Sequence, residues 1–227
     1  MRAGCERFRV ISTGMGADLG IAGPGWAVWG ALALGYVLGA IPFGLILTRV
    51  TGAGDLRQIG SGNIGATNVL RTGRKGLAAS TLLLDMGKGA VAVVLARLLW
   101  GDDGVWNAAP LMAAAGAMAG HCLPVWLRFR GGKGVATVLG VALGLAWPVG
   151  VICALVWVLA ARLSKISSVG GMSAAVAAPV AALGLGHGAF LPVLGAVAVL
   201  VVWRHHENIA RLIAGTEPRV GRKAKGG

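Results

Sequence analysis

Long apolar runs separated by short glycine-rich or basic connections set the strongest limit on the fold of this chain. A helix of about 20 apolar residues crosses the roughly 30 Å hydrocarbon layer of a bilayer. Runs that reach or approach this length cover residues 26–49, 77–99, 105–127, 166–186 and 189–203. Only 13% of the residues are charged and 56% are hydrophobic, too few polar side chains to cover a soluble protein of 227 residues. The sequence therefore predicts an all-α polytopic membrane protein.

An apolar segment with Pro148 near its middle is either one kinked span or two short helices over 135–147 and 149–161. A single span would place Arg162 and Lys165 across the bilayer from the two glycine-rich stretches described below. Two short helices place all these cations and the basic C-terminus on one side, as the positive-inside rule favours. Each would have only about 13 residues, or roughly 20 Å. We expect about seven transmembrane helices, with the N-terminus outside and the C-terminus in the cytoplasm.

The chain divides by composition into an N-terminal extension (1–25), a transmembrane domain (26–203) and a basic cytoplasmic tail (204–227). The extension lacks a continuous apolar core, so it is a poor signal peptide. Its three arginines would lie on the outer side, against the positive-inside rule. A chain beginning at Met15 would lose all three. We therefore expect residues 1–14 to be an artefact of start-codon choice or a disordered extension with no part in catalysis.

The net charge of +13 comes from 21 Lys and Arg residues against 8 Asp and Glu residues. In a soluble protein such an excess would suggest nucleic acid, but here the cations fall between apolar runs. This distribution indicates orientation in a bilayer and contact with anionic lipid or an anionic substrate. We expect no nucleic-acid partner. The three cysteines show no C-x-x-C spacing, and we expect neither a metal nor a cofactor.

A first glycine-rich loop, G-S-G-N-I-G-A-T-N-V-L-R-T-G-R-K-G at 60–76, lies between two apolar runs. Its glycines allow positive φ, so consecutive backbone N–H groups can face one anion. Arg71 adds a planar fork suited to phosphate or carboxylate. Further hydroxyl and amide donors are Ser61, Asn63, Thr67 and Asn68. The loop is interpreted as an anion site; the alternative is a flexible positive connection.

A second glycine-rich stretch, G-G-K-G-V-A-T at 131–137, places a lysine between glycines just before a predicted helix. Backbone N–H groups, the helix N-terminus and Lys133 would then face the same anion. The stretch lacks Walker A spacing because Gly134 follows Lys133, so ATP hydrolysis loses its main support. In the tail, His205 and Asn208 are three residues apart and share one face of a short amphipathic helix.

These three stretches resemble, in the same order, the signature motifs of the PlsY family of bacterial acyl-phosphate:glycerol-3-phosphate acyltransferases. The matching letters are S-G-N-x-G-A-T-N-x-x-R at 61–71, G-G-K-G-V-A-T at 131–137, and H-x-x-N-I-x-R-L with G-T-E-P-R at 205–219. The resemblance runs from about residue 26 to residue 221. The family normally lacks residues equivalent to 1–25.

The resemblance implies a seven-span enzyme of the bacterial inner membrane with its active site at the cytoplasmic face. Its reaction would move a fatty acyl group from acyl phosphate to the 1-hydroxyl of sn-glycerol 3-phosphate. The products would be lysophosphatidate and phosphate. The partners would be these two substrates, membrane lipid and, functionally, the soluble acyltransferase that forms acyl phosphate.

The site residues are a separate expectation, which combines this resemblance with the donors identified in the two loops. Glycerol 3-phosphate would be bound by Ser61, Asn63, Thr67, Asn68, Arg71, Ser167, His205 and Asn208. Acyl phosphate would be bound by Gly131, Gly132, Lys133, Gly134 and Thr137. The catalytic residues would be His205, Asn208, Lys133 and Arg71. No histidine is followed five residues later by Asp, so the H-x-x-x-x-D acyltransferase dyad is absent, and the base is either His205 or an oxygen of acyl phosphate, which the family favours.

Several alternatives remain open on the sequence. Asp85 and Lys88 lie three residues apart within a predicted span, where they either neutralise each other or take part in catalysis. Glu217 is expected to pair with Arg219 in a turn, and His121 is assigned to packing or to the interface. An organophosphate or anion transporter would use similar loops, but such folds usually place their site near the midplane between internal repeats.

Overall fold

The structure is a computed structural model that describes residues 25–101 and 108–220. Within these residues all regular structure is helical, as predicted. The α-helices are α1 (Gly25–Gly39), α2 (Phe43–Val50), α3 (Ala66–Leu70), α4 (Lys75–Trp100), α5 (Ala108–Cys122), α6 (Val135–Leu145), α7 (Trp147–Ser164), α8 (Ser167–Gly184), α9 (Leu191–Arg204) and α10 (His206–Ile213). Apart from Gly25, the predicted extension lies outside the described residues.

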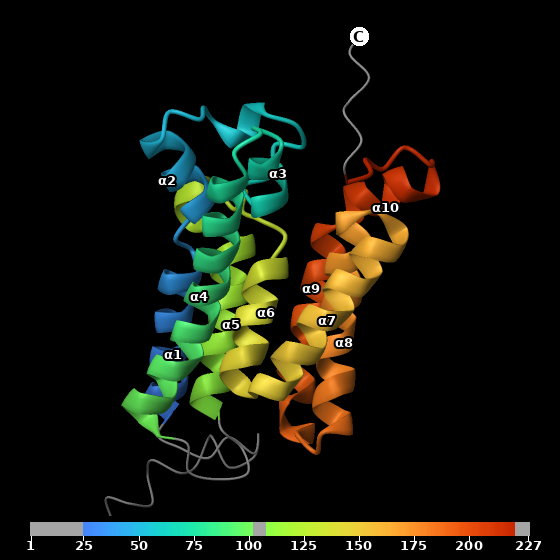
Figure 1. Ribbon diagram of the computed structural model, residues 1–227. Coiled ribbons are helices and arrows are strands. Elements are labelled where there is room, and N and C mark those ends of the chain that lie inside the picture. Colours follow the sequence, from blue (N-terminus) through green and yellow to red (C-terminus); the bar gives the residue numbers. More distant parts are fainter. Residues whose placement is uncertain (1–24, 102–107, 221–227) are drawn as a thin grey trace, which may run out of the picture.

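The long helices form a bundle with its short helices at one end. Helices α1, α4, α5 and α6 pack together, and α7, α8 and α9 stand beside them (Figure 1). The short helices α2, α3 and α10 lie at the same end of this bundle (Figure 1). Because the glycine-rich loops adjoin these short helices or the start of α6, the predicted site residues gather at that end.

Four segments in the described part of the chain are long and apolar enough to cross a membrane. They are Gly25–Val50, Ala108–Leu127, Trp147–Ser164 and Ser167–Gly184, and a fifth arises if α9 and α10, which meet at 57°, are one bent span. This confirms the helical membrane class. The 26-residue α4, which carries Asp85, Lys88 and Arg97, is not among these segments, and α6 has only 11 residues.

The chain breaks before Pro148, as the two-helix interpretation predicts. Ala146 is extended, and α7 then begins at Trp147 with Pro148 in its first turn, where a missing N–H costs no helical hydrogen bond. Arg97 of α4 donates hydrogen bonds to the carbonyls of Gly144 and Leu145, both 2.8 Å long, and so satisfies the end of α6. Helix α7 reaches Ser164, further than the predicted 149–161.

Helices α1 and α5 approach each other through glycines spaced four apart. A Cβ added at Gly35 or Gly39 would lie 2.1 Å from the carbonyl oxygen of Ala113 or Ala117, respectively. Gly116 of α5 is packed as closely against α1. Small residues of this kind let helices pack in lipid, where apolar burial alone gives little drive to associate. The packing fixes α5, whose C-terminal end supports the second glycine-rich loop.

Candidate active site

One central cavity at this end of the bundle collects most of the predicted site residues. Those that line it are Ser61, Asn63, Thr67, Asn68, Arg71, Lys133, Gly134, Ser167, His205 and Asn208. Gly131, Gly132 and Thr137 do not line it. The cavity is therefore walled by both glycine-rich loops, the start of α8 and the junction of α9 with α10.

The first loop is held together by Asn68 from within. The buried Asn68 amide donates to the carbonyls of Leu56 and Ile59, both at 2.9 Å, and its Oδ1 accepts the N–H of Ser61 at 3.2 Å. These bonds tie the loop to residues 56–61, and they engage both ends of the amide, so the geometry gives Asn68 a positioning role. Gly60 has φ +56°, and a Cβ there would lie 2.6 Å from Asn68 Oδ1.

Arg71 presents its guanidinium beside this framework. Arg71 directly follows α3, is exposed and lines the cavity. Within residues 25–101 and 108–220 its side chain makes no ion pair or hydrogen bond. A planar fork without a protein partner is suited to bidentate contact with a phosphate.

The second loop (131–134) is held by its neighbours. The N–H groups of Gly131 and Gly132 donate to the carbonyls of Cys122 and His121 at 3.2 and 3.0 Å. Arg204, the last residue of α9, donates to the carbonyls of the same two glycines at 2.9 and 3.2 Å. These glycine amides are therefore engaged within the protein. The part left facing the cavity is Lys133, Gly134 and the first turn of α6, where N–H groups lack helical partners.

Lys133 connects the second loop to the tail. Its Nζ donates to Oδ1 of Asn208 on α10. Burial, and then the nearby Arg211 guanidinium, hold the pKa of Lys133 below its usual value. The amine still has donor positions beyond the one that Asn208 uses, because an ammonium group carries three.

Glu217 organises the tail around Asn208. Its Oε1 accepts from Asn208 Nδ2 at 2.5 Å and from the Ser168 hydroxyl at 2.6 Å, and its Oε2 accepts from Arg211 at 2.7 Å. Burial raises the pKa of this carboxyl, but the three hydrogen bonds outweigh burial, so the pKa lies below its usual value. The predicted pairing with Arg219 is wrong: the ion pair is with Arg211, which α10 brings to Glu217.

His205 occupies the bend between α9 and α10 and is 2% exposed. Its Nδ1 lies 2.7 Å from the carbonyl oxygen of Val201. Because a carbonyl only accepts, Nδ1 carries the hydrogen and Nε2 remains an acceptor. Asn208 follows one turn later, so both side chains reach the same cavity, as the three-residue spacing predicts.

A buried polar cluster forms the floor of the cavity. Lys88 Nζ lies 2.7 Å from Asp85 Oδ1 and donates to the carbonyl of Ile41 at 2.8 Å, at the break between α1 and α2. The His121 ring lies 3.8 Å from the same carboxylate, and both Asp85 and His121 line the cavity. A Cβ on Gly132 would lie 2.1 Å from His121 Nε2, so the second loop rests on this ring. Asp85 and Lys88 do pair, and the pair supports the site.

Four residues around the site were not assigned to it from the sequence: His121, Arg204, Arg211 and Glu217. Arg204 immediately precedes the tail motif and Arg211 belongs to it, so the motif could have pointed to both residues. His121 is ten residues before Gly131 and gives no local signal, because its role depends on α5 packing under the loop.

The fold and the cavity define a helical membrane protein in which two glycine-rich loops, each with a cationic side chain facing the cavity, meet at one end of the bundle. A family model described as glycerol-3-phosphate acyltransferase matches residues 29–215, so the chain belongs to this family.

Named relatives agree over most of their length. A glycerol-3-phosphate acyltransferase of Ruegeria pomeroyi is 59% identical over 200 residues, covering 88% of this chain and 93% of the relative. One from Erythrobacter litoralis is 55% identical over 193 residues, covering 85% and 95%. The crystal structure of PlsY (YgiH), an integral membrane glycerol 3-phosphate acyltransferase, in its glycerol 3-phosphate form is similar with a TM-score of 0.79. That match has 33% identity and covers 86% of this chain and 96% of the other. The lysophosphatidic acid form gives a TM-score of 0.77 at 32% identity and covers 86% and 95%.

Proposed function

We propose that this protein transfers a fatty acyl group from acyl phosphate to the 1-hydroxyl of sn-glycerol 3-phosphate. The products are lysophosphatidate and inorganic phosphate, the first acylation of phospholipid synthesis. The observation that carries the proposal is the contact between Lys133 of the second loop and Asn208 of the tail, in the cavity that Arg71 also lines. Two anion-binding loops that border one cavity could hold two phosphate-bearing substrates close enough to react.

The acceptor site is assigned to the first loop and the junction of α9 with α10. Arg71 and Ser61 bind the phosphate of glycerol 3-phosphate, and Asn63 and Thr67 add donors beside them. Ser167, His205 and Asn208 orient the hydroxyl groups of glycerol. Asn68 acts through the loop, since its amide is already engaged.

The donor site is assigned to Lys133 and the start of α6. The lysine and the free N–H groups of the first helical turn bind the phosphate of acyl phosphate. Gly131 and Gly132 position Lys133 through their contacts with α5 and Arg204. Thr137, whose hydroxyl lies 3.2 Å from the Asp85 carbonyl oxygen, joins α6 to α4.

The reaction is an acyl transfer from an activated donor to a hydroxyl group. The 1-hydroxyl oxygen attacks the acyl carbonyl carbon, the carbon–oxygen bond to phosphate breaks, and phosphate leaves. The hydroxyl proton passes either to an oxygen of that phosphate or to Nε2 of His205. Because acyl phosphate has a good leaving group, positioning and charge stabilisation supply most of the rate enhancement.

The same proposal covers the topology and the location. With α9 counted as a span, adding α4 and α6 to the four segments listed above gives seven, with the N-terminus outside and the C-terminus in the cytoplasm. The unit from residue 26 to the tail motif would be embedded in a bacterial inner membrane with its site at the cytoplasmic face. Acyl phosphate would come from a soluble acyltransferase that forms it.

A reaction with purified protein tests the function. In detergent, with no vesicle and therefore no gradient, acyl phosphate and glycerol 3-phosphate should yield lysophosphatidate and an equal amount of phosphate. Acyl-CoA and acyl carrier protein should not replace acyl phosphate, because the donor site fits a single phosphate. Absence of product in detergent, with gradient-dependent uptake of glycerol 3-phosphate in vesicles, would contradict the proposal and indicate a transporter.

A further inference from the structure

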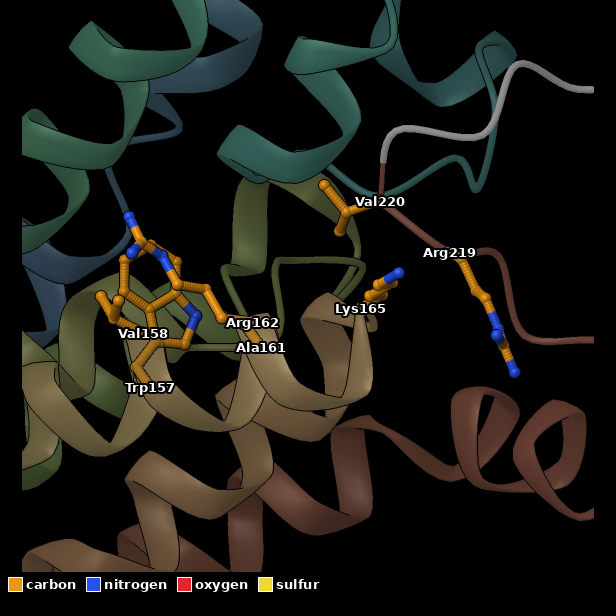
Figure 2. A pocket seen from close by; sticks show the side chains of 7 residues that line it. All are labelled: Trp157, Val158, Ala161, Arg162, Lys165, Arg219 and Val220. Atoms are coloured by element: carbon orange, nitrogen blue, oxygen red, sulfur yellow. The ribbon is translucent and has the colours of Figure 1, made fainter.

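A second cavity lies where α7 ends, at the edge of the bundle. This rim groove has a volume of about 800 Å³ and is lined by Trp157, Val158, Ala161, Arg162, Lys165, Arg219 and Val220 (Figure 2). Figure 2 shows that its walls come from α7 and from the C-terminal segment. The Val220 N–H donates to the Lys165 carbonyl at 2.7 Å and ties that segment to the end of α7.

The polar part of the rim groove is cationic. Arg162, Lys165 and Arg219 line it, and no acidic residue does. In the part of the chain that the structure describes, none of the three side chains forms an ion pair or a hydrogen bond. Glu217 is two residues from Arg219 but is already held by Asn208, Ser168 and Arg211. The three charges are therefore not neutralised by the residues around them.

The other residues that line the rim groove are apolar, and α7 exposes further apolar side chains outside the groove. Only 17% of the most apolar stretch of α7 is buried, compared with 67% for Ala108–Leu127. Leu155, Leu159 and Leu163 are 65%, 60% and 77% exposed on this helix. An occupant that satisfies the whole groove needs an anionic group at one end and long apolar chains at the other.

We propose that the rim groove binds an anionic phospholipid of the bilayer. The headgroup lies over the end of α7, where the long side chains of Arg162, Lys165 and Arg219, which point in different directions in Figure 2, turn toward its phosphate when the lipid binds. The acyl chains lie along the apolar surface of α7. Arg162 and Lys165 stand at the end of a membrane-spanning helix, the depth at which phospholipid phosphates lie. A soluble anion would leave the apolar part empty, so charge and surface together favour a lipid.

The site has a consequence for the central cavity because both share one segment of the tail. Arg219 is two residues after Glu217, which holds Asn208 and through it Lys133. A headgroup that neutralises the three cations also fixes this segment against α7. We expect the bound lipid to stabilise the arrangement of Glu217 and Asn208.

Lipid retention by the full chain tests the proposal directly. Protein in phosphatidylcholine nanodiscs containing a minor fraction of phosphatidylglycerol is released and analysed by native mass spectrometry. In the variant Arg162→Gln/Lys165→Gln/Arg219→Gln, phosphatidylglycerol should bind about a hundredfold more weakly, since each cation near an anionic surface contributes about fivefold. The three single variants should each lose about fivefold.

The matched control is Arg49→Gln/Lys75→Gln/Arg130→Gln, which removes three exposed cations elsewhere on the described surface. It should retain phosphatidylglycerol like the unchanged protein. An equal loss in both triple variants would overturn the site, because it would show only general surface charge. Retention of lysophosphatidate without phosphatidylglycerol would also overturn it and assign the rim groove to the reaction product.

Hydrogen exchange at one amide gives a second measurement. The Val220 N–H joins the C-terminal segment to the end of α7 by donating to the Lys165 carbonyl. Adding phosphatidylglycerol should slow its exchange in the unchanged protein and have no effect in the triple groove variant. Exchange that is equally slowed in both would contradict the proposal, whatever the activity of either variant.

Discussion

The backbones of the two glycine-rich loops are held in place in different ways. The first loop is closed from within by Asn68, and its cation, Arg71, is exposed. The second is closed from outside by α5 and Arg204, and its cation, Lys133, is partly buried and bonded to Asn208. The conformation of the first loop therefore depends on contacts between residues close in sequence. The conformation of the second loop depends on the packing of α5 and α9 against it.

This difference predicts different sensitivities. A change in the first loop should act mainly on the substrate that the loop binds. A change in the second should act on its substrate and on packing together, because the loop has no internal support. Four substitutions test this contrast, in order of decreasing effect.

Lys133→Ala should cause the largest loss, about a hundredfold in kcat/KM for acyl phosphate. Charge-assisted hydrogen bonds contribute roughly 1.5–3 kcal/mol, and burial of Lys133 places it at the upper end of that range. Steady-state kinetics with varied acyl phosphate measure the effect. Full activity of the purified, folded variant would refute the donor-site assignment.

Arg71→Ala should lower kcat/KM for glycerol 3-phosphate by about tenfold, the lower end of the same range, because the guanidinium is exposed to solvent. The free energy of unfolding should stay unchanged, since Asn68 closes the loop without Arg71. Arg74→Ala is the matched control, because Arg74 donates to the Thr51 carbonyl and does not line the cavity. An equal loss in both variants would count against the acceptor-site assignment.

Gly132→Ala should destabilise the protein by about 1–3 kcal/mol, the usual cost of overpacking. The added methyl would lie 2.1 Å from His121 Nε2. Activity should fall less than in Lys133→Ala, because the amine remains. Gly76 follows the first loop in the first turn of α4, and a Cβ added there would have nothing within 4 Å, so Gly76→Ala should be neutral or stabilising. Thermal unfolding in detergent compares the two, and equal midpoints would show that the second loop is not supported by α5.

The same contrast explains which parts of the molecule were predictable. The break at Pro148 and the first loop depend on residues close in sequence, so local patterns predicted them. The support of the second loop by His121 and Arg204 joins residues up to 73 positions apart, as in the bond from Arg204 to Gly131. No local pattern reports such a contact. The predicted partner of Glu217 was wrong for a related reason. Whether Arg211 or Arg219 faces the carboxylate depends on how α10 packs, and the local sequence does not show this.

Glu217→Gln should have the smallest effect, and it depends on pH. The pKa of Glu217 is lower in the folded protein than its usual value of about 4.3. A carboxyl of this kind stabilises the fold above its unfolded pKa, and this contribution disappears as the pH falls through the folded pKa. The glutamine variant cannot form the Arg211 ion pair at any pH, so its melting temperature should lie a few degrees lower at neutral pH. Between pH 7 and pH 3 that difference should shrink, because acid removes the contribution from the unchanged protein alone. Glu207→Gln, which removes an exposed carboxyl from the neighbouring helix α10, should melt like the unchanged protein throughout. A constant gap between the melting temperatures of the Glu217→Gln and unchanged proteins would show that Glu217 stabilises the tail by shape and not by charge.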